Sequence, residues 1–404
     1  MNRRKLPTHS VYFILLIAIC AVAVFSFYSP EICFADKSQS GEEIIEDNVD
    51  ENLSKMDLSK LEELLASLEN DFRTLFGNDA VSTIKSIIDG DFQGNFSDFI
   101  SIIYKSVGKS ILDVLPMVLT IVAVAIIYSL LEGLSSGFVR QPTKKLIYFA
   151  TYSAIILIVM VEIGSVISLT TNTITSIKKV MEAIFPTLLT LVTLLGGVNS
   201  SAVFKPMMVT LTTFITSFIA NIIIPFFIAA IAFSVIGNLT KSVKLDRLTG
   251  FFRSSATYVL GGVFSLFIAF LTFQGLTGGV IDSISIKTAK FAIQSYVPIL
   301  GGYLSDGFDL MLASLVLIKN SLGIVSLLMI LSVIALPTIK IAVLGLGLKL
   351  ASGIIEPICD SKFSKMLHGV STNLTLLIVS LVGVGFMFLL TVMLVIYTFN
   401  VGVI

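Results

Sequence analysis

The sequence predicts an all-α, polytopic membrane protein. Hydrophobic residues make up 55% of the 404 residues and charged residues only 13%, and the mean hydropathy of +0.95 lies well outside the range of soluble domains. Several uncharged runs reach the roughly 20 residues that a helix needs to cross a bilayer. Nucleic-acid binding is excluded as a function class, because a phosphate-binding surface needs clustered Lys and Arg.

The N-terminus has the pattern of a secretory signal peptide. A basic start at residues 3–5 precedes an apolar run at 11–27, and the small residue Ala35 comes just before the acidic region. We therefore predict that residues 1–35 are a signal peptide cleaved after Ala35, with an uncleaved anchor as the alternative. In both cases the chain from Asp36 onward is expected to be exported.

The exported region before the first firm crossing is acidic. Residues 36–110 carry 16 acidic and 7 basic side chains. Residues 36–57 have little to bury and are predicted to be an acidic flexible linker. Residues 58–110 are predicted to be a helical extracytoplasmic region with three short amphipathic helices, the first opened by a capping box of Ser59 and Glu62. These helices could form a small bundle, lie on the membrane surface or pack on a partner protein.

Residues 111–404 are predicted to form a transmembrane helical domain. The expected crossings are 111–131, 146–167, 207–236, 256–273, an inward run at 321–336, and 374–399. This arrangement places the basic residues of three loops on one side, as the positive-inside rule requires. Those residues are Arg140, Lys144 and Lys145, then Lys241, Lys244, Arg247 and Arg253, then Lys349, Lys362 and Lys365.

Prolines predict discontinuous helices in this domain. The expected breaks are at Pro186, Pro225, Pro298 and Pro337. Irregular backbone at membrane depth persists only where protein or a wet cavity covers it. We therefore expect residues 180–197 and 296–312 to be re-entrant or surface segments on the outer side. A full crossing at 180–197 followed by a pair of crossings that meet at Pro225 would give the same sidedness, and the sequence does not separate the two topologies.

The spacing of these prolines suggests a weak internal repeat. Each pair, Pro186 with Pro225 and Pro298 with Pro337, is separated by 39 residues, so one offset of 112 (298 − 186) superimposes both pairs. The repeat halves would be 146–238 and 258–350, a plan that many transporters use to build a site near the bilayer midplane. Few other residues agree at this offset, and chance is the alternative.

Five polar residues are candidates for an intramembrane pathway. They are Glu162, Gln274, Lys319, Asp306 and Asp309. An ionisable group inside a membrane is costly and marks a pathway, a relay or a helix contact. Glu162 could instead lie near the outer interface. Lys319 could pair with Asp306, Asp309 or Glu162, or it could extend to a lipid headgroup.

The residues offer no catalytic, cofactor or metal site. After the signal peptide the chain retains one cysteine, Cys359, and one histidine, His368, which cannot supply a multi-histidine metal site. The segment 237–242 lacks the second glycine of a phosphate-binding loop. We expect a protein that is not an enzyme, needs no cofactor and takes energy from a gradient or a partner ATPase.

The stretch from Ser285 to Asp360 resembles the stage III sporulation protein AE family. The motifs are Lys287-Thr288-Ala289-Lys290-Phe291, Val297-Pro298-Ile299-Leu300-Gly301-Gly302, Leu304-Ser305-Asp306, Leu317-Ile318-Lys319-Asn320-Ser321-Leu322-Gly323, Leu336-Pro337-Thr338-Ile339-Lys340, Lys349-Leu350-Ala351 and Glu356-Pro357. The family tends to have Arg at Lys287 and Gln at Glu356. The order of signal sequence, acidic helical region and hydrophobic domain is also similar.

The resemblance implies a role in sporulation. Family members act as subunits of a channel, or feeding-tube, complex in the mother-cell membrane around the forespore, and this complex supports late forespore gene expression. The implied partners are other stage III sporulation A-series proteins, including ring subunits and a secretion-type ATPase, and a forespore-side channel partner. The ectodomain would lie in the intermembrane space, and homo-oligomerisation stays open.

Two other functions fit the residues alone. One is a stand-alone secondary transporter that couples a small solute to an ion through Glu162. The other is a membrane scaffold whose ectodomain positions the rings.

Overall fold

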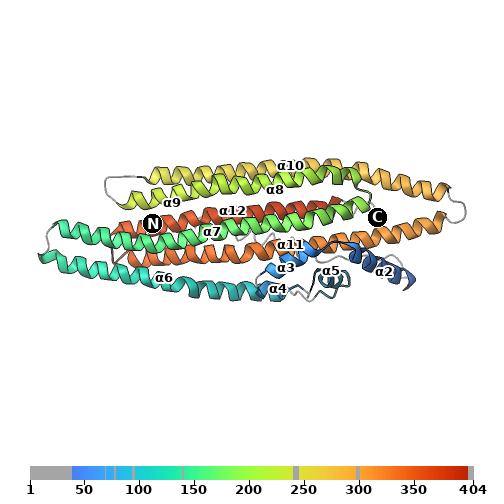
Figure 1. The fold of residues 1–404 in the computed structure, drawn as a ribbon. Coiled ribbons are helices and arrows are strands. Elements are labelled where there is room, and N and C mark those ends of the chain that lie inside the picture. Colours follow the sequence, from blue (N-terminus) through green and yellow to red (C-terminus); the bar gives the residue numbers. More distant parts are fainter. Residues whose placement is uncertain are drawn as a thin grey trace, which may run out of the picture.

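The computed structural model is an elongated bundle of long helices with four short helices along one side (Figure 1). It describes residues 39–68, 70–76, 79–92, 96–138, 141–239, 245–296 and 301–398. Within these ranges the chain forms helices and no strands. The long helices are α6 (Phe96–Phe138), α7 (Gln141–Leu194), α8 (Val198–Phe218), η1 (Ile219–Ile223), α9 (Ile224–Leu239), α10 (Asp246–Tyr296), α11 (Gly301–Ile355) and α12 (Ser361–Thr398).

Six helical segments of the described chain are long and apolar enough to cross a membrane, with α8, η1 and α9 counted together as one. This confirms the predicted all-α, polytopic class. The segments are far longer than a crossing requires. α7 has 54 residues and α11 has 55, so at about 1.5 Å per residue each is roughly 80 Å long, whereas the hydrocarbon core is about 30 Å thick. Much of the bundle therefore extends beyond the hydrocarbon.

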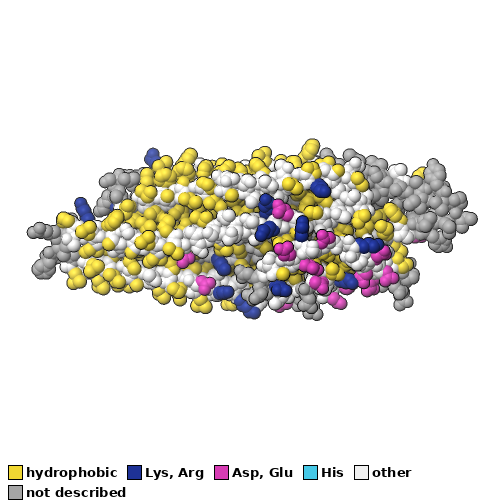
Figure 2. All heavy atoms as spheres, viewed as in Figure 1, with side chains coloured by type: hydrophobic (Ala, Val, Ile, Leu, Met, Phe, Trp, Pro, Cys, Tyr) yellow, Lys and Arg dark blue, Asp and Glu magenta, His cyan; other side chains and the backbone are white. Residues whose placement is uncertain are grey.

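The turns alternate between the two ends of the bundle. Figure 1 shows the α6–α7, α9–α10 and α11–α12 connections towards one end, and the α7–α8 and α10–α11 connections towards the other. The end with three connections contains Lys144, Arg247 and Lys362, so the described parts of the three predicted basic loops share one end. Arg140, Lys241 and Lys244 lie outside the described residues. On the face shown in Figure 2, hydrophobic side chains dominate the half towards that end, and charged side chains gather near the short helices.

The breaks expected at Pro186 and Pro337 are wrong, because both prolines lie inside continuous helices, α7 and α11. An internal proline costs a helix about 3 kcal/mol, but a break at either position would leave several backbone groups without hydrogen-bond partners within the packed bundle, at a higher cost. At Pro225 the helix departs from α geometry, since the π-helical η1 ends two residues before it. Pro298 lies outside the described residues.

The re-entrant segments are also replaced by helix. Residues 180–194 are the last part of α7, and residues 301–312 are the start of α11. The offset of 112 also fails to superimpose the turns. It maps the α7–α8 turn at 195–197 onto residues 307–309 (195 + 112), which lie inside α11. The two halves share only the order of two antiparallel long helices.

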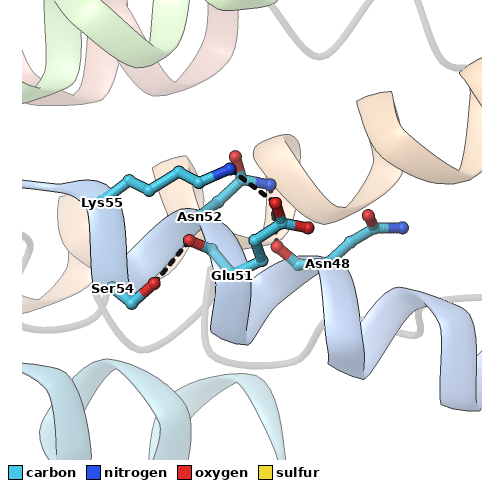
Figure 3. A network of polar contacts seen from close by, with 5 residues as sticks. All are labelled: Asn48, Glu51, Asn52, Ser54 and Lys55. Carbon is cyan, nitrogen blue, oxygen red and sulfur yellow. Dashed lines mark hydrogen bonds and ion pairs between the residues drawn. The ribbon is translucent and has the colours of Figure 1, made fainter.

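The acidic segment at 36–57 is helical where it is described, which corrects the predicted flexible linker. α2 spans Gln39–Lys55 and packs against α11. Val49 and Leu53 are buried, and with Ile45 they form a stripe at four-residue spacing. The opposite face stays polar, with an ion pair between Lys55 and Glu51 and local hydrogen bonds such as Asn52 to the Asn48 carbonyl (Figure 3). Tertiary packing on α11 therefore overrides the disorder that the composition predicts.

Three further short helices complete the region that the sequence predicts to be the ectodomain. They are α3 (Ser59–Ser67), α4 (Asn70–Arg73) and α5 (Ala80–Ile88). They pack on α7, α6 and α11, respectively, so the partner of these helices is the bundle of the same chain. The third predicted helix, at 96–107, is the first part of α6 and continues directly into the first crossing.

The capping box lies in a different helix from the predicted one. Ser59 makes no capping box with Glu62; its backbone N–H and hydroxyl donate to the Asp57 carboxylate. These hydrogen bonds hold the pKa of Asp57 below its ordinary value. A capping box instead opens α5, where Asp79 accepts from the Ser82 N–H and the Ser82 hydroxyl accepts from the Asp79 N–H.

Candidate functional site

The centre of the bundle is the seam between α11 and α12. Lys319 lies on α11 with none of its surface exposed, and its Nζ donates to the Ile396 carbonyl at 2.9 Å. α12 ends at Thr398, so this carbonyl is among the last four of the helix, which have no partner within it. A cation here also interacts favourably with the negative end of the helix dipole. Lys319 therefore caps the C-terminus of α12 from a neighbouring helix.

Glycines let α12 approach α11 closely along this seam. A Cβ atom at Gly323, one turn after Lys319, would overlap the Ile396 side chain. A Cβ atom at Gly385 would overlap Ile334 in the same way. Two residues of α11 therefore contact the last turn of α12: Lys319 through its hydrogen bond, and Gly323 through close backbone packing.

The pairings of Lys319 with Asp306 and Asp309 are wrong. Both aspartates lie on the same continuous helix as Lys319, 13 and 10 residues before it, which is about 20 and 15 Å along the axis. An ion pair needs the charged atoms within about 4 Å. Asp306 is exposed and Asp309 is half-buried. The burial of Lys319 also contradicts the alternative that it extends to a headgroup.

The other two pathway candidates lie elsewhere. Glu162 is half-buried on α7, and Gln274 belongs to α10, with its side chain outside the described part. Asn320 follows Lys319 on α11, and its Oδ1 is buried and accepts no hydrogen bond from described residues. Sequence reasoning found Lys319 but missed its acceptor, since a backbone carbonyl leaves no signal in the side-chain pattern.

A cleft separates the ectodomain from the bundle. It has a volume of about 370 Å³ and lies between α3, α4, α7 and α11. Glu63 and Lys179 contribute opposite charges from α3 and α7, while Phe72 and Leu336 contribute apolar walls. Leu336 also packs with Phe72 and Ile102 in a small separate core. At this cleft the start of the Leu336–Lys340 motif lies beside α3 and α4.

Comparison with known proteins identifies the family. A family model described as stage III sporulation protein AE matches residues 79–398, most of the chain. The chain belongs to the stage III sporulation protein AE family. The stage III sporulation protein AE of Bacillus subtilis (strain 168) is 23% identical over 387 residues, which cover 96% of this chain and 97% of that protein. No solved structure matches the chain.

The family assignment confirms the resemblance seen in the motifs between residues 287 and 357, and it supports a role in sporulation. The match runs from the N-cap of α5 to the last residue of α12. It therefore includes Lys319, Gly323, Gly385 and Ile396, the residues that form the α11–α12 seam.

The basic end of this family member holds an aromatic cluster. The rings of Tyr148, Tyr152 and Phe363 have centroids 5.1 to 5.8 Å apart. The Tyr148 hydroxyl donates to the Asn238 carbonyl at 3.3 Å, and the Tyr152 hydroxyl donates to the Val235 carbonyl at 2.6 Å. The end of α9 is thus also capped by side chains of a neighbouring helix, here with neutral donors.

Cys359 lies in the turn between α11 and α12 at the same end. Its thiol donates to the Ala125 carbonyl at 3.2 Å. Burial, and next the nearby Glu132 and Asp360 carboxylates, raises the pKa of this thiol to about 11. The cysteine is therefore a protonated packing residue at neutral pH.

A second open groove of this family member lies between α7 and α8, at the end opposite the basic loops. It has a volume of about 290 Å³, and its floor contains Phe185 and Met208. Glu182 stands on the α7 wall and Lys205 on the α8 wall. Both charged side chains are exposed.

Proposed function

We propose that this chain is a membrane-embedded subunit of the sporulation channel, or feeding-tube, complex that links mother cell and forespore and supports late forespore gene expression. The observation that carries the proposal is the packing of α2 and α5 on α11, the same helix whose apolar remainder lies in the middle of the bundle. An exported surface and a membrane bundle are thereby joined through one continuous helix. A subunit that binds partners outside the membrane needs such a rigid connection to its membrane-embedded bundle.

The distribution of charge supports the proposed orientation. Basic residues gather at the end with the α6–α7, α9–α10 and α11–α12 connections, which the positive-inside rule assigns to the mother-cell cytoplasm. The ectodomain would then face the intermembrane space. There it could contact ring-forming A-series subunits and the forespore-side partner, while a secretion-type ATPase acts from the cytoplasmic end. The proposal gives the chain no catalytic chemistry.

The orientation is tested by labelling single cysteines in a chain whose three native cysteines are serine. A membrane-impermeant thiol reagent should label a cysteine at Ser176 from outside, and one at Ser364 only after the membrane is opened. Both positions are half-buried or buried, so labelling in detergent provides the control for accessibility. The reverse pattern would reject the orientation.

The role of the ectodomain is tested at its contact with α11. Val49→Asp and Leu53→Asp place a carboxylate in the buried stripe of α2, which costs several kcal/mol unless the helix detaches. The proposal expects normal membrane insertion, loss of co-purifying A-series subunits and loss of heat-resistant spores. Ile44→Asp is the matched control, because Ile44 is exposed on the same helix.

The rival function is an ion-coupled carrier that works through Glu162, and the half-buried position of that carboxylate on α7 is the observation in its favour. The channel-subunit proposal expects Glu162→Gln to leave spore formation unchanged. A carrier would lose transport with the same substitution, since the amide cannot bind and release a proton. Loss of spores with normal complex assembly would therefore favour the carrier.

A further inference from the structure

The groove between α7 and α8 has the charge arrangement of a self-complementary surface. Glu182 lies on one wall and Lys205 on the other, and both line the same groove. Among the described residues Glu182 pairs only loosely with Lys178, one turn away at 3.6 Å, and Lys205 makes no ion pair. Two opposite charges therefore stand side by side on the rim and remain available to a partner.

Apolar side chains around the groove are exposed in a place where lipid tails cannot cover them. Val209 on α8 is 67% exposed and lines the groove. It lies about one helical turn after the exposed Lys205, and Lys179 and Glu182 are exposed on the facing part of α7. Exposed charges are costly in hydrocarbon, so this part of the bundle lies outside it. An apolar surface in water marks a protein contact.

We propose that the α7–α8 groove is the interface between two copies of this chain. All copies in one membrane share the same orientation, so a two-fold axis relating them runs along the membrane normal and nearly parallel to the helices. Rotation by 180° about such an axis places α7 of one copy against α8 of the other at the same height. Each Glu182 then faces the partner's Lys205, and the contact occurs twice.

The same rotation brings the two apolar rims together. Val209 would meet the partner's α7 near Pro186, which is exposed and also lines the groove. The buried floor, with Phe185 and Met208, stays within each copy. The inference is independent of the proposed function, because it concerns the assembly of the purified chain alone.

Charge reversal tests the pairing. Two differently tagged copies are produced together, purified and reconstituted in bilayer discs, and recovery of one tag with the other is measured. Glu182→Lys or Lys205→Glu in both copies turns two attractions into two repulsions, and recovery should fall about tenfold. The double variant Glu182→Lys/Lys205→Glu restores both pairs and should return recovery to the wild-type value. All of these changes lie at exposed positions, and the double variant itself reports that the chain folds.

Cross-linking tests the register. In the cysteine-free chain, one tagged copy carries Glu182→Cys and the other carries Lys205→Cys, and a short thiol-reactive cross-linker is added. The mixed pair should give the dimer in high yield, and either variant with itself should give little, since position 182 faces 205 across the axis. Val161→Cys, exposed in the middle of α7, is the control for random collision.

Three results would overturn the proposal. The first is a chain that occupies the discs as a monomer. The second is single charge reversals that leave recovery unchanged. The third is a double reversal that stays as weak as the single ones, which would assign the two charges to a different protein.

Discussion

Two helices of nearly equal length, α10 and α11, have different surroundings. α10 has 51 residues and α11 has 55, but in their most apolar windows 22% of α10 and 56% of α11 is buried. α10 packs mainly on α9 and α12, whereas α11 contacts α6, α7, α12 and the ectodomain. Hydropathy does not separate them, because lipid tails are as apolar as a protein core.

Small and polar residues explain why α11 is more deeply buried than α10. Gly323 and Gly347 of α11 lie against Ile396 and Val114 of neighbouring helices, while a Cβ atom at Gly261 or Gly262 of α10 would meet nothing within 4 Å. α11 also holds the buried Lys319. In this bundle, close backbone approach and capping of helix ends, more than hydrophobicity, identify the interior helix.

The largest effect is expected at Lys319. Lys319→Glu would place a carboxylate against the Ile396 carbonyl in a buried site and should cost at least about 3–5 kcal/mol. We expect almost no full-length chain in the membrane, measured by immunoblot of membrane fractions. Lys340→Glu is the control, because Lys340 is exposed on the same helix. Equal accumulation of both variants would refute the interior role of α11.

The next effect is expected at the glycines of the seam. Gly385→Leu forces a side chain into Ile334, and overpacking of this kind costs about 1–3 kcal/mol. Gly262→Leu on α10 should leave the thermal midpoint in detergent nearly unchanged. A double variant with Ile334→Ala should recover part of the loss through coupling between the two sites. The comparison between α10 and α11 fails if both leucine variants melt alike.

A smaller effect concerns the turn between α11 and α12. The pKa of the Cys359 thiol is raised to about 11 from its usual 9.0, so at pH 8 the reactive thiolate is about 100-fold less abundant than for an ordinary thiol. Alkylation in native detergent should be correspondingly slow and should accelerate as the pH rises towards 11. A denatured sample of the same chain gives the reference rate, and equal rates would show that the turn is open.

The smallest effect is expected in the ectodomain helix that packs on α11. The backbone N–H and hydroxyl of Ser82 hold the pKa of Asp79 below its ordinary value. The carboxylate therefore stabilises α5 at pH values above the ordinary Asp range, and this contribution is lost as the pH falls through the lowered pKa. Asp79→Ala should cost about 1 kcal/mol, seen as faster amide exchange in α5 at pH 7. Asp79→Asn should retain most of the stability that the N-cap gives to α5. Its amide does not titrate, so that stability should not fall at acid pH.

The sequence was sufficient for the class and for the gathering of the basic loops, where they are described, at one end of the bundle. Hydrophobic periodicity and the positions of charged residues depend on one helix at a time, so both can be recognised in the sequence. Pro186 and Pro337 were misjudged because the cost of a proline competes with the cost of exposing backbone groups, and that second cost depends on what surrounds the helix.

The ectodomain was misjudged for a related reason. Residues 36–57 are acidic enough to predict disorder, yet Val49 and Leu53 bury themselves on α11. The stripe of Ile45, Val49 and Leu53 was present in the sequence, but its partner surface is about 250 residues away along the chain. The Lys319 site was half predicted: an unusual lysine can be noticed, whereas a carbonyl acceptor at the end of another helix appears only with the fold.

The acceptor of Lys319 also sets an order for the folding of the bundle. Ile396 follows Lys319 by 77 residues, so this hydrogen bond can form only after α12 has been made and has packed back along α11. The hydrogen bond therefore reports the docking of α12, and a variant chain cut short within α12 lacks it.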